Sequence, residues 1–371
     1  MRFISRSMGG AALMLAAGGA AAQSNVTLYG VVDTLVQYLN NGGKTSISER
    51  SGGSTGSMIG LKGSEDLGGG LKAIFDLESG FTANNGAFFV DSSKLFERQS
   101  WVGLASDHYG TLTFGRQYQP SFWIAYFAEP FRGNEILSPF SAGILPVDKR
   151  TLSTQYPAGR VDNSILYRSP VLGGFKFYAM YALPDTVTQP VPVTSGDVLD
   201  VGVTYEGYGL YAGLAYQNQH AGTETFPGLP PALNLLPTEH FTGALAYRLG
   251  IVNLQFIYTY ARPGNAPAGS PAAQLNAGHS VSVAELGATI QATAADVIEV
   301  AAVERNVRGA HDNTVGIELG ADHNLSKRTS VYMRAGYMKN HGSATASWPG
   351  VSVTGTGTSQ TLFALGIMHR F

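Results

Sequence analysis

Apolar and polar side chains alternate with a period of two through most of the chain. In 25–39, for example, Val26, Leu28 and Val36 fall on one side of an extended strand, and Asp33 and Gln37 fall on the other. This follows because successive side chains of a strand point to opposite faces. If the apolar side meets lipid, a charge on it near mid-membrane costs about 2–4 kcal/mol. Asp33 is therefore expected to face an aqueous interior.

The same alternation predicts sixteen strands joined by connections that are alternately short and long. The strands are expected near 25–39, 57–63, 71–81, 95–105, 111–118, 163–169, 174–183, 198–206, 209–219, 239–248, 251–262, 280–291, 296–307, 313–324, 328–340 and 358–371. The long connections are expected at 40–55, 83–94, 119–162, 184–197, 220–238, 263–279 and 341–357, whereas the turn at 65–70 is tight. A barrel with one rim of turns and one rim of loops requires this rhythm. We therefore predict an all-β fold, a 16-stranded antiparallel transmembrane β-barrel.

The two ends of the chain carry different signals. Arg2 and Arg6 precede an apolar run, Met8 to Ala22, that is too short to span a bilayer as a helix. This pattern predicts a signal peptide over 1–22 and a barrel over 23–371. One side of the last strand is formed by Phe363, Leu365, Ile367, His369 and Phe371. Because an unpaired apolar edge invites aggregation, this strand is expected to close the barrel against the first.

Composition and charge narrow the class of protein. Charged residues are 13% of the 371 residues, against roughly 25% in a typical soluble domain. After the N-terminal run, no stretch of about 18 uncharged apolar residues offers a transmembrane helix. The chain has no cysteine, which excludes disulfides, thiolate catalysis and zinc–thiolate sites. Loss of the first 22 residues takes the formal charge from −2 to −4, and this charge without a basic run argues against a nucleic-acid partner.

Several blocks of sequence resemble one family. In chain order they are VTLYGVVD, GLKGSEDLGGGLKAIFDLESGF, WVGL, TFGRQY, DNSILYRSP, LSKRTSVY and the final HRF. This pattern is similar to that of the trimeric general porins of β-proteobacteria and of the neisserial type, and it covers nearly all of 23–371. The alternating strand that ends on Phe371 also resembles the assembly signal of Gram-negative outer-membrane proteins.

The resemblance implies a passive diffusion channel for small hydrophilic solutes and inorganic ions in the outer membrane of a Gram-negative bacterium. It implies a homotrimer, contact with membrane lipid and with the outer-membrane assembly machinery, and no cofactor. It also implies that the third loop, 119–162, folds into the barrel and narrows the channel; this loop begins with an aromatic cluster around Trp123. The family usually has Ser-Arg before the second strand's glycine, but here Ser57-Met58 stands there, so one expected positive charge is missing.

Charged side chains around a constriction bias which ion enters a pore. Strand parity points four bases inward, Lys62, Lys72, Arg98 and Arg334. Parity alone sets Arg116 on the lipid side, but the family places this arginine in the pore, and a β-bulge at the preceding glycine would re-aim it. The alternative for each base is a salt bridge or a rim charge without effect on flux.

Glu129 and Glu135 of the third loop are the acids expected to face these bases. Five bases against two acids predict a weak anion preference, because ions respond mainly to charges within the Debye length of about 10 Å at 0.1 M salt. At that distance one charge in water is worth about 0.4 kcal/mol, so the preference should be only a few-fold.

Motifs typical of enzymes occur in the wrong context. Gly52–Gly56 matches G-x-S-x-G but lies in a polar loop, and Gly207–Gly209 spans a hairpin turn with no helix after it. No H-x-x-x-H pair supports a metal site. Two alternatives remain: a channel specific for a sugar or an organic acid, and, with less support, an outer-membrane barrel enzyme or adhesin.

Overall fold

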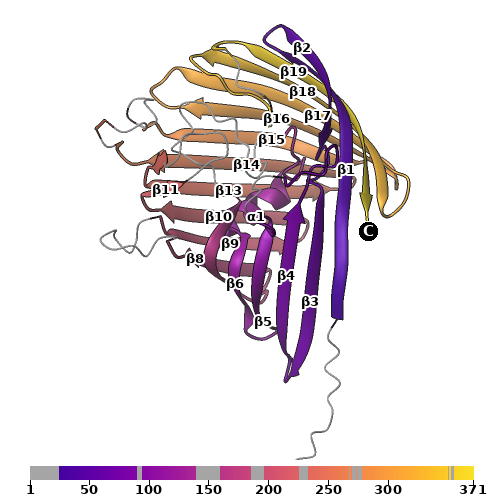
Figure 1. Ribbon diagram of the computed structural model, residues 1–371, viewed down its shortest axis with the longest axis vertical. Helices are drawn as coiled ribbons and strands as arrows, with labels where there is room; N and C mark the ends of the chain where they lie inside the picture. Colours follow the sequence, from indigo (N-terminus) through magenta and orange to yellow (C-terminus); the bar gives the residue numbers. More distant parts are fainter. Residues whose placement is uncertain are drawn as a thin grey trace, which may run out of the picture.

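The computed structural model describes residues 25–89, 94–138, 159–184, 196–224, 233–266, 268–269, 273, 278–349, 351 and 355–371. These residues form one large sheet of antiparallel strands, a small two-stranded sheet and a short helix (Figure 1). The expected signal peptide at 1–22 lies outside the described residues, as does 139–158 of the third loop. None of the described helical residues forms a helix long and apolar enough to cross a membrane.

Sixteen strands close into a barrel, as predicted. They are β1 (Asn25–Asn41), β3 (Met58–Gly68), β4 (Leu71–Gly80), β5 (Gln99–Ser106), β6 (Gly110–Tyr118), β7 (Arg160–Arg168), β8 (Phe175–Ala182), β9 (Val198–Gly207), β10 (Leu210–Gln219), β13 (Thr238–Leu249), β14 (Val252–Pro263), β15 (Val281–Gln291), β16 (Asp296–Val307), β17 (Asp312–Asn324), β18 (Thr329–Gly342) and β19 (Ser359–Arg370). Each pairs with its neighbours in this order, and β19 pairs with β1 from Val31↔Arg370 to Asn41↔Gln360. Figure 1 shows these first and last strands side by side. The barrel therefore has no free edge.

Three connections contain more strand than predicted. The expected connection 40–55 contains a further strand, β2 (Lys44–Ser51), which forms a hairpin with the second half of β1. The β-branched Thr45 and Ile47 suit such a ribbon, and pairing with β1 satisfies its backbone groups. β3 continues to Gly68, so that the turn is shorter than 65–70. The connection after β10 contains a small hairpin, β11 (Gly222–Glu224) with β12 (Leu233–Leu235).

The alternation of side chains separates a lipid-facing wall from a polar interior. Large aliphatic side chains on the outside are well exposed, with Leu214 at 65% and Ile317 at 64%. Polar side chains of the opposite parity are buried within the barrel, where Asp33 accepts hydrogen bonds from the backbone N–H groups of Ser54 and Thr55 at 2.7 and 2.8 Å. The prediction that Asp33 faces the interior is confirmed.

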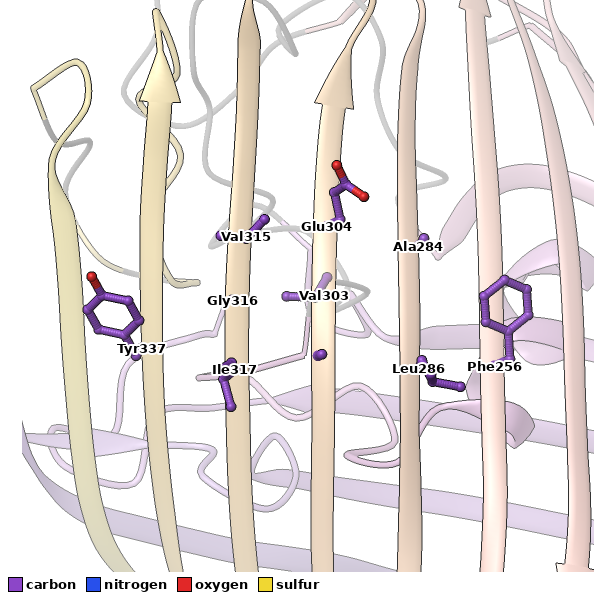
Figure 2. A pocket seen from close by; sticks show the side chains of 10 residues that line it. Phe256, Ala284, Leu286, Val303, Glu304, Val315, Gly316, Ile317 and Tyr337 are labelled. Atoms are coloured by element: carbon purple, nitrogen blue, oxygen red, sulfur yellow. The ribbon is translucent and has the colours of Figure 1, made fainter.

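The outer wall carries a shallow apolar groove of about 380 Å³ across β14 to β18 (Figure 2). Its lining includes the small residue Ala284 and the larger Phe256, Leu286 and Tyr337. These residues have outward parity, so the groove belongs to the lipid-facing surface. The channel must be sought on the other side of the sheet.

Candidate functional site

The third loop enters the barrel directly after β6 and forms the helix α1 (Pro120–Ala128), which contacts the inner wall from β8 to β14. Ile124 fills the space over Gly202 of β9 and Gly213 of β10. A Cβ atom at either glycine would lie 2.4–2.6 Å from the Ile124 side chain. Larger wall residues would therefore push the helix towards the centre of the barrel.

A buried carboxylate fixes the start of this helix. Asp200 of β9 accepts hydrogen bonds from the backbone N–H and the hydroxyl of Ser121. Proline at the first helical position, Pro120, leaves no N–H to satisfy there. The family-based expectation that the third loop folds inward is confirmed for its described part, 119–138.

The segment after α1 is held by its own polar side chains. The Glu129 carboxylate accepts the backbone N–H groups of Phe131 and Gly133. The Asn134 side-chain oxygen accepts the N–H groups of residues 136, 137 and 138 at 2.7–3.2 Å. These bonds hold 129–138 in a compact turn.

Apolar packing holds the same segment against the wall. Ile136 and Leu137 are fully buried, and a Cβ at Gly336 of β18 would lie 2.7 Å from Leu137. Trp348, from the connection before β19, also enters the barrel and covers Gly316 and Gly336. No sequence pattern indicates this second inward loop, because a lone tryptophan in a loop has no periodicity to interpret.

One cluster of charges joins the wall to the third loop. Arg98 Nε lies 3.8 Å from Glu78 Oε2, and Arg98 Nη2 donates to the Tyr118 hydroxyl at 3.1 Å. Arg160 also donates to Tyr118, and its guanidinium lies 4.3 Å from the ring centroid. Glu135 and Arg98 meet beside Gly56. A Cβ placed at this glycine would lie 3.2 Å from the Glu135 carboxylate and 3.0 Å from the Arg98 guanidinium.

A second cluster surrounds Arg334 on β18. Its guanidinium donates to both Asp322 oxygens at 3.0 Å and lies 3.6 Å from Glu299 Oε2. The side chain also lies 4.9 Å from the Tyr332 ring centroid. Arg334 is only 3% exposed. It therefore neutralises two wall acids and is poorly accessible to a passing ion.

The two predicted lysines lie at different depths. Lys62 of β3 is exposed on the inner side, with its ammonium 4.7 Å from the Tyr29 ring centroid, and it pairs in register with Asp76 of β4. Lys72 has inward parity, but it lies six residues along β4 from Glu78, which is about 20 Å at 3.3 Å per residue. The structure thus places Lys72 near the rim of short turns and away from the third loop.

Arg116 sits where the β-bulge was expected, but the extra residue belongs to β7. The register runs Gly115↔Ser164 and then Gln117↔Val161, so two residues of β7 oppose Arg116. Its guanidinium lies 2.6 Å from Asp162 Oδ1 and donates to a backbone carbonyl of the segment before β5. Arg116 keeps the strand parity of Leu112 and Phe114. It bonds Asp162 and the Glu97 carbonyl rather than the third-loop acids.

Glu129 faces acids rather than bases on the wall. It is fully buried, and the groups across from it are Glu285 of β15 and Glu318 of β17, whose carboxylate oxygens have no hydrogen-bond partner among the described residues. Glu299 of β16 and Arg132 of the loop lie nearby. Burial raises the pKa of Glu129 to about 7. The expectation that Glu129 faces the basic wall is therefore wrong, because the loop turns this side chain outward, against β15–β17.

The closing strand has the predicted outward face. Phe363, Leu365 and Ile367 are 40–55% exposed, and His369 bonds the Thr329 hydroxyl at 2.9 Å. The Phe371 backbone exchanges hydrogen bonds of 3.1 and 3.2 Å with Gly30, where a Cβ would lie 2.4 Å from the phenyl ring. Its role as an assembly signal stays a prediction.

Three lining residues, Arg50, Arg132 and Arg160, were missed from the sequence, whereas Glu78 was expected to face inward from its strand parity. Arg50 of β2 bonds Gln37 at 2.7 Å and a third-loop carbonyl; Glu78 and Arg160 belong to the Arg98 cluster. Arg132 is exposed from the third loop within the barrel. The described residues include no group of three or more His, Asp or Glu side chains arranged to hold a metal ion.

These features define a channel: a closed transmembrane barrel with a polar lumen narrowed by an inward loop. The family model described as Gram-negative porin matches residues 9–343, so this chain belongs to the Gram-negative porin family. It is an outer-membrane protein that lets small hydrophilic solutes and ions diffuse passively.

Known porins resemble the chain over nearly its whole length. An outer membrane porin protein of Bordetella pertussis is 28% identical, over 97% of this chain and 98% of the relative. Outer membrane porin protein 32 of Delftia acidovorans is also 28% identical, with the same coverage. The solved anion-selective porin from Comamonas acidovorans matches with a TM-score of 0.77 and 25% identity, over 94% of this chain and all of that one.

Proposed function

We propose that this general diffusion channel weakly prefers anions. The observation that supports the proposal is the unequal burial of charge around the third loop. The acids Glu78, Glu129, Glu135 and Glu299 are each at most 8% exposed, whereas Lys62 and Arg132 are exposed within the barrel. An ion in the lumen therefore meets accessible bases first. The anion selectivity of the similar Comamonas acidovorans porin has the same sign.

The preference should be small. The buried acids still contribute to the field, and three buried arginines (Arg98, Arg160 and Arg334) offset them. One accessible charge at about 10 Å in water contributes about 0.4 kcal/mol, or roughly a factor of two in local ion concentration. A surplus of one to three positive charges gives a preference of a few-fold, reduced further by salt.

A planar bilayer under a KCl gradient tests the sign through the zero-current potential. We expect wild-type protein to prefer chloride, and Lys62→Gln and Arg132→Gln each to shift the potential towards zero. Arg262→Gln is the matched control, because this exposed arginine pairs with Glu239 and has outward strand parity. Cation preference in the wild type, or an equal shift in the control, would refute the proposal.

The remaining parts of the proposal follow the family. We assign the lining to the predicted Lys62, Arg98, Glu135 and Arg334, extended by Arg132, with Lys72 and Arg116 as outlying charges. Transport rather than catalysis is proposed because the inner side chains form ion pairs around an open lumen. We also propose a homotrimer that covers part of the apolar outer wall, which gives a trimer mass by light scattering in mild detergent.

A further inference from the structure

The face of α1 that looks away from the wall is aromatic and open. Trp123 and Phe127, four residues apart, stack with ring centroids 5.7 Å apart and planes at 22°. Phe127 is 49% exposed, although it lies within the polar barrel. This exposure leaves one face of the stacked ring pair open to a solute in the lumen.

The aromatic face continues onto the wall of the barrel. The Tyr211 ring of β10 meets Phe127 edge-on at 6.1 Å, and its hydroxyl donates to the Ile124 carbonyl at 3.0 Å, which fixes the ring. On the other side, Tyr118 lies 4.9 Å from Trp123. Ring faces along this path are held in place before any solute arrives, so little ordering entropy is lost on binding.

Two bases stand beside the aromatic path on the same inner wall. Arg168 of β7 lies opposite Tyr178 of β8 in register, and Lys176 holds its ammonium 5.6 Å from the Tyr178 ring centroid. β8 is two strands from β10, which is about 10 Å at the usual strand spacing. Neither base has a carboxylate within ion-pair distance among the described residues, and both are half-buried. Glu206 is the acid on the neighbouring inner positions, opposite Tyr211.

We propose that the face formed by Trp123, Phe127, Tyr211, Arg168 and Lys176 is a weak binding site for aromatic carboxylates. The planar ring stacks on Phe127 and Trp123, because ring faces attract in offset or edge-on geometry. The carboxylate is drawn to Arg168 and Lys176, neither of which forms an ion pair with an acid among the described residues, although Glu206 lies on the neighbouring inner positions. Such a site raises the local concentration of this solute at the narrow part of the channel. The inference deepens the proposed function by naming a class of anion.

A neutral sugar could also stack on the rings, but it would gain nothing from the two bases. A saturated ring acid would gain from the bases but lack the flat π-face. Benzoate, cyclohexanecarboxylate and glucose therefore separate the contributions with three small probes. Only the aromatic acid gains from both the aromatic rings and the two bases.

The test is block of single-channel current in KCl by each probe. We expect benzoate to produce concentration-dependent interruptions, with cyclohexanecarboxylate and glucose at least about fivefold weaker. Phe127→Ala should shorten the benzoate residence time about fivefold, as loss of one aromatic contact implies. Lys176→Gln should lower the benzoate on-rate while leaving the residence of neutral phenol unchanged. Phe241→Ala, an outward aromatic, is the matched control.

Equal block by benzoate and cyclohexanecarboxylate would overturn the proposal, as would block by glucose that exceeds both. Unchanged residence in Phe127→Ala would do the same, provided that the variant forms a heat-modifiable barrel. The zero-current potential measured on the same channels reports the anion preference separately. If the channels show no anion preference but benzoate still blocks them, only the proposed preference is contradicted. If they prefer anions but benzoate does not block them, only the aromatic site is contradicted.

Discussion

At the scale of single residues, burial decides what a charge does in this barrel. Arg334 was predicted as a lining base, and it does point inward, but its guanidinium is paired with the carboxylates of Asp322 and Glu299. Lys62 and Arg132 remain accessible, since they lie on open inner surface. The same side-chain chemistry thus serves stability in one place and ion attraction in another.

Arg334→Met should destabilise the barrel strongly. Removing one partner of a buried ion pair leaves the other charges uncompensated, at a cost of about 3–5 kcal/mol. We expect the temperature at which the folded band converts on semi-native gels to fall. Arg262→Met removes one partner of a solvent-exposed ion pair, which contributes little to stability, and should leave that temperature nearly unchanged. Equal transition temperatures for the two variants would contradict the assignment.

At the scale of elements, the third loop packs against glycines of the barrel wall, and its turn after α1 carries the titratable side chain of Glu129. α1 rests on Gly202 and Gly213, and Leu137 rests on Gly336. Between these contacts, Glu129 points towards Glu285 and Glu318. Ionising several carboxylates that share a buried site is costly, because like charges repel and lose their hydration. The stability of the packed loop therefore depends on whether these carboxylates are protonated.

Raising the pH should loosen the third loop. The seated loop keeps the pKa of Glu129 at about 7, above the ordinary value of roughly 4.3. The seated state therefore binds more protons than a released loop between those values, and its stability falls as pH rises through this window. We expect open-channel current noise to increase from pH 6 to pH 8, and Glu129→Gln to remove most of the increase.

Glu304→Gln is the control for that measurement, because this acid lies at the lipid-facing groove (Figure 2). The groups that face Glu129 from β15, β16 and β17 are Glu285, Glu299 and Glu318, and Arg132 faces it from the loop. These groups account for any pH dependence that survives in Glu129→Gln. An undiminished rise in noise in that variant would reject Glu129 as the main titrating group.

At the scale of the whole molecule, closure joins the two ends of the barrel. β19 pairs with β1 over eleven residues, and Phe371 caps Gly30. Deleting Phe371 removes two backbone hydrogen bonds and the ring that covers Gly30. The amount of heat-modifiable protein in the outer membrane should drop sharply.

Arg370→Gln, which changes an exposed side chain of the same strand outside its outward apolar face, is the matched control and should accumulate normally. Refolding of both variants in detergent separates the two roles of Phe371. If the deletion variant folds there but not in cells, the phenylalanine acts as an assembly signal; normal amounts in cells would contradict both roles.

The sequence by itself determined the barrel. Period-two alternation is a local property of each strand. It can be recognised in the sequence because one face of the strand meets lipid and must be apolar, whereas the other meets water and is polar. The sixteen strands, the inward Asp33 and the closing β19 all follow from it. The inward third loop was available only from the resemblance to porins.

The tertiary structure decided which inward charges meet. Whether Glu129 faces bases or acids depends on how 129–138 turns over Pro130, whose ring fills the space above Gly287 of β15. Arg116 depends on an extra residue in β7, far away in sequence. The inward Trp348 depends on room left by Gly316 and Gly336. These are contacts between distant segments, and no local pattern encodes them, because the space that each side chain occupies is set by glycines on other strands.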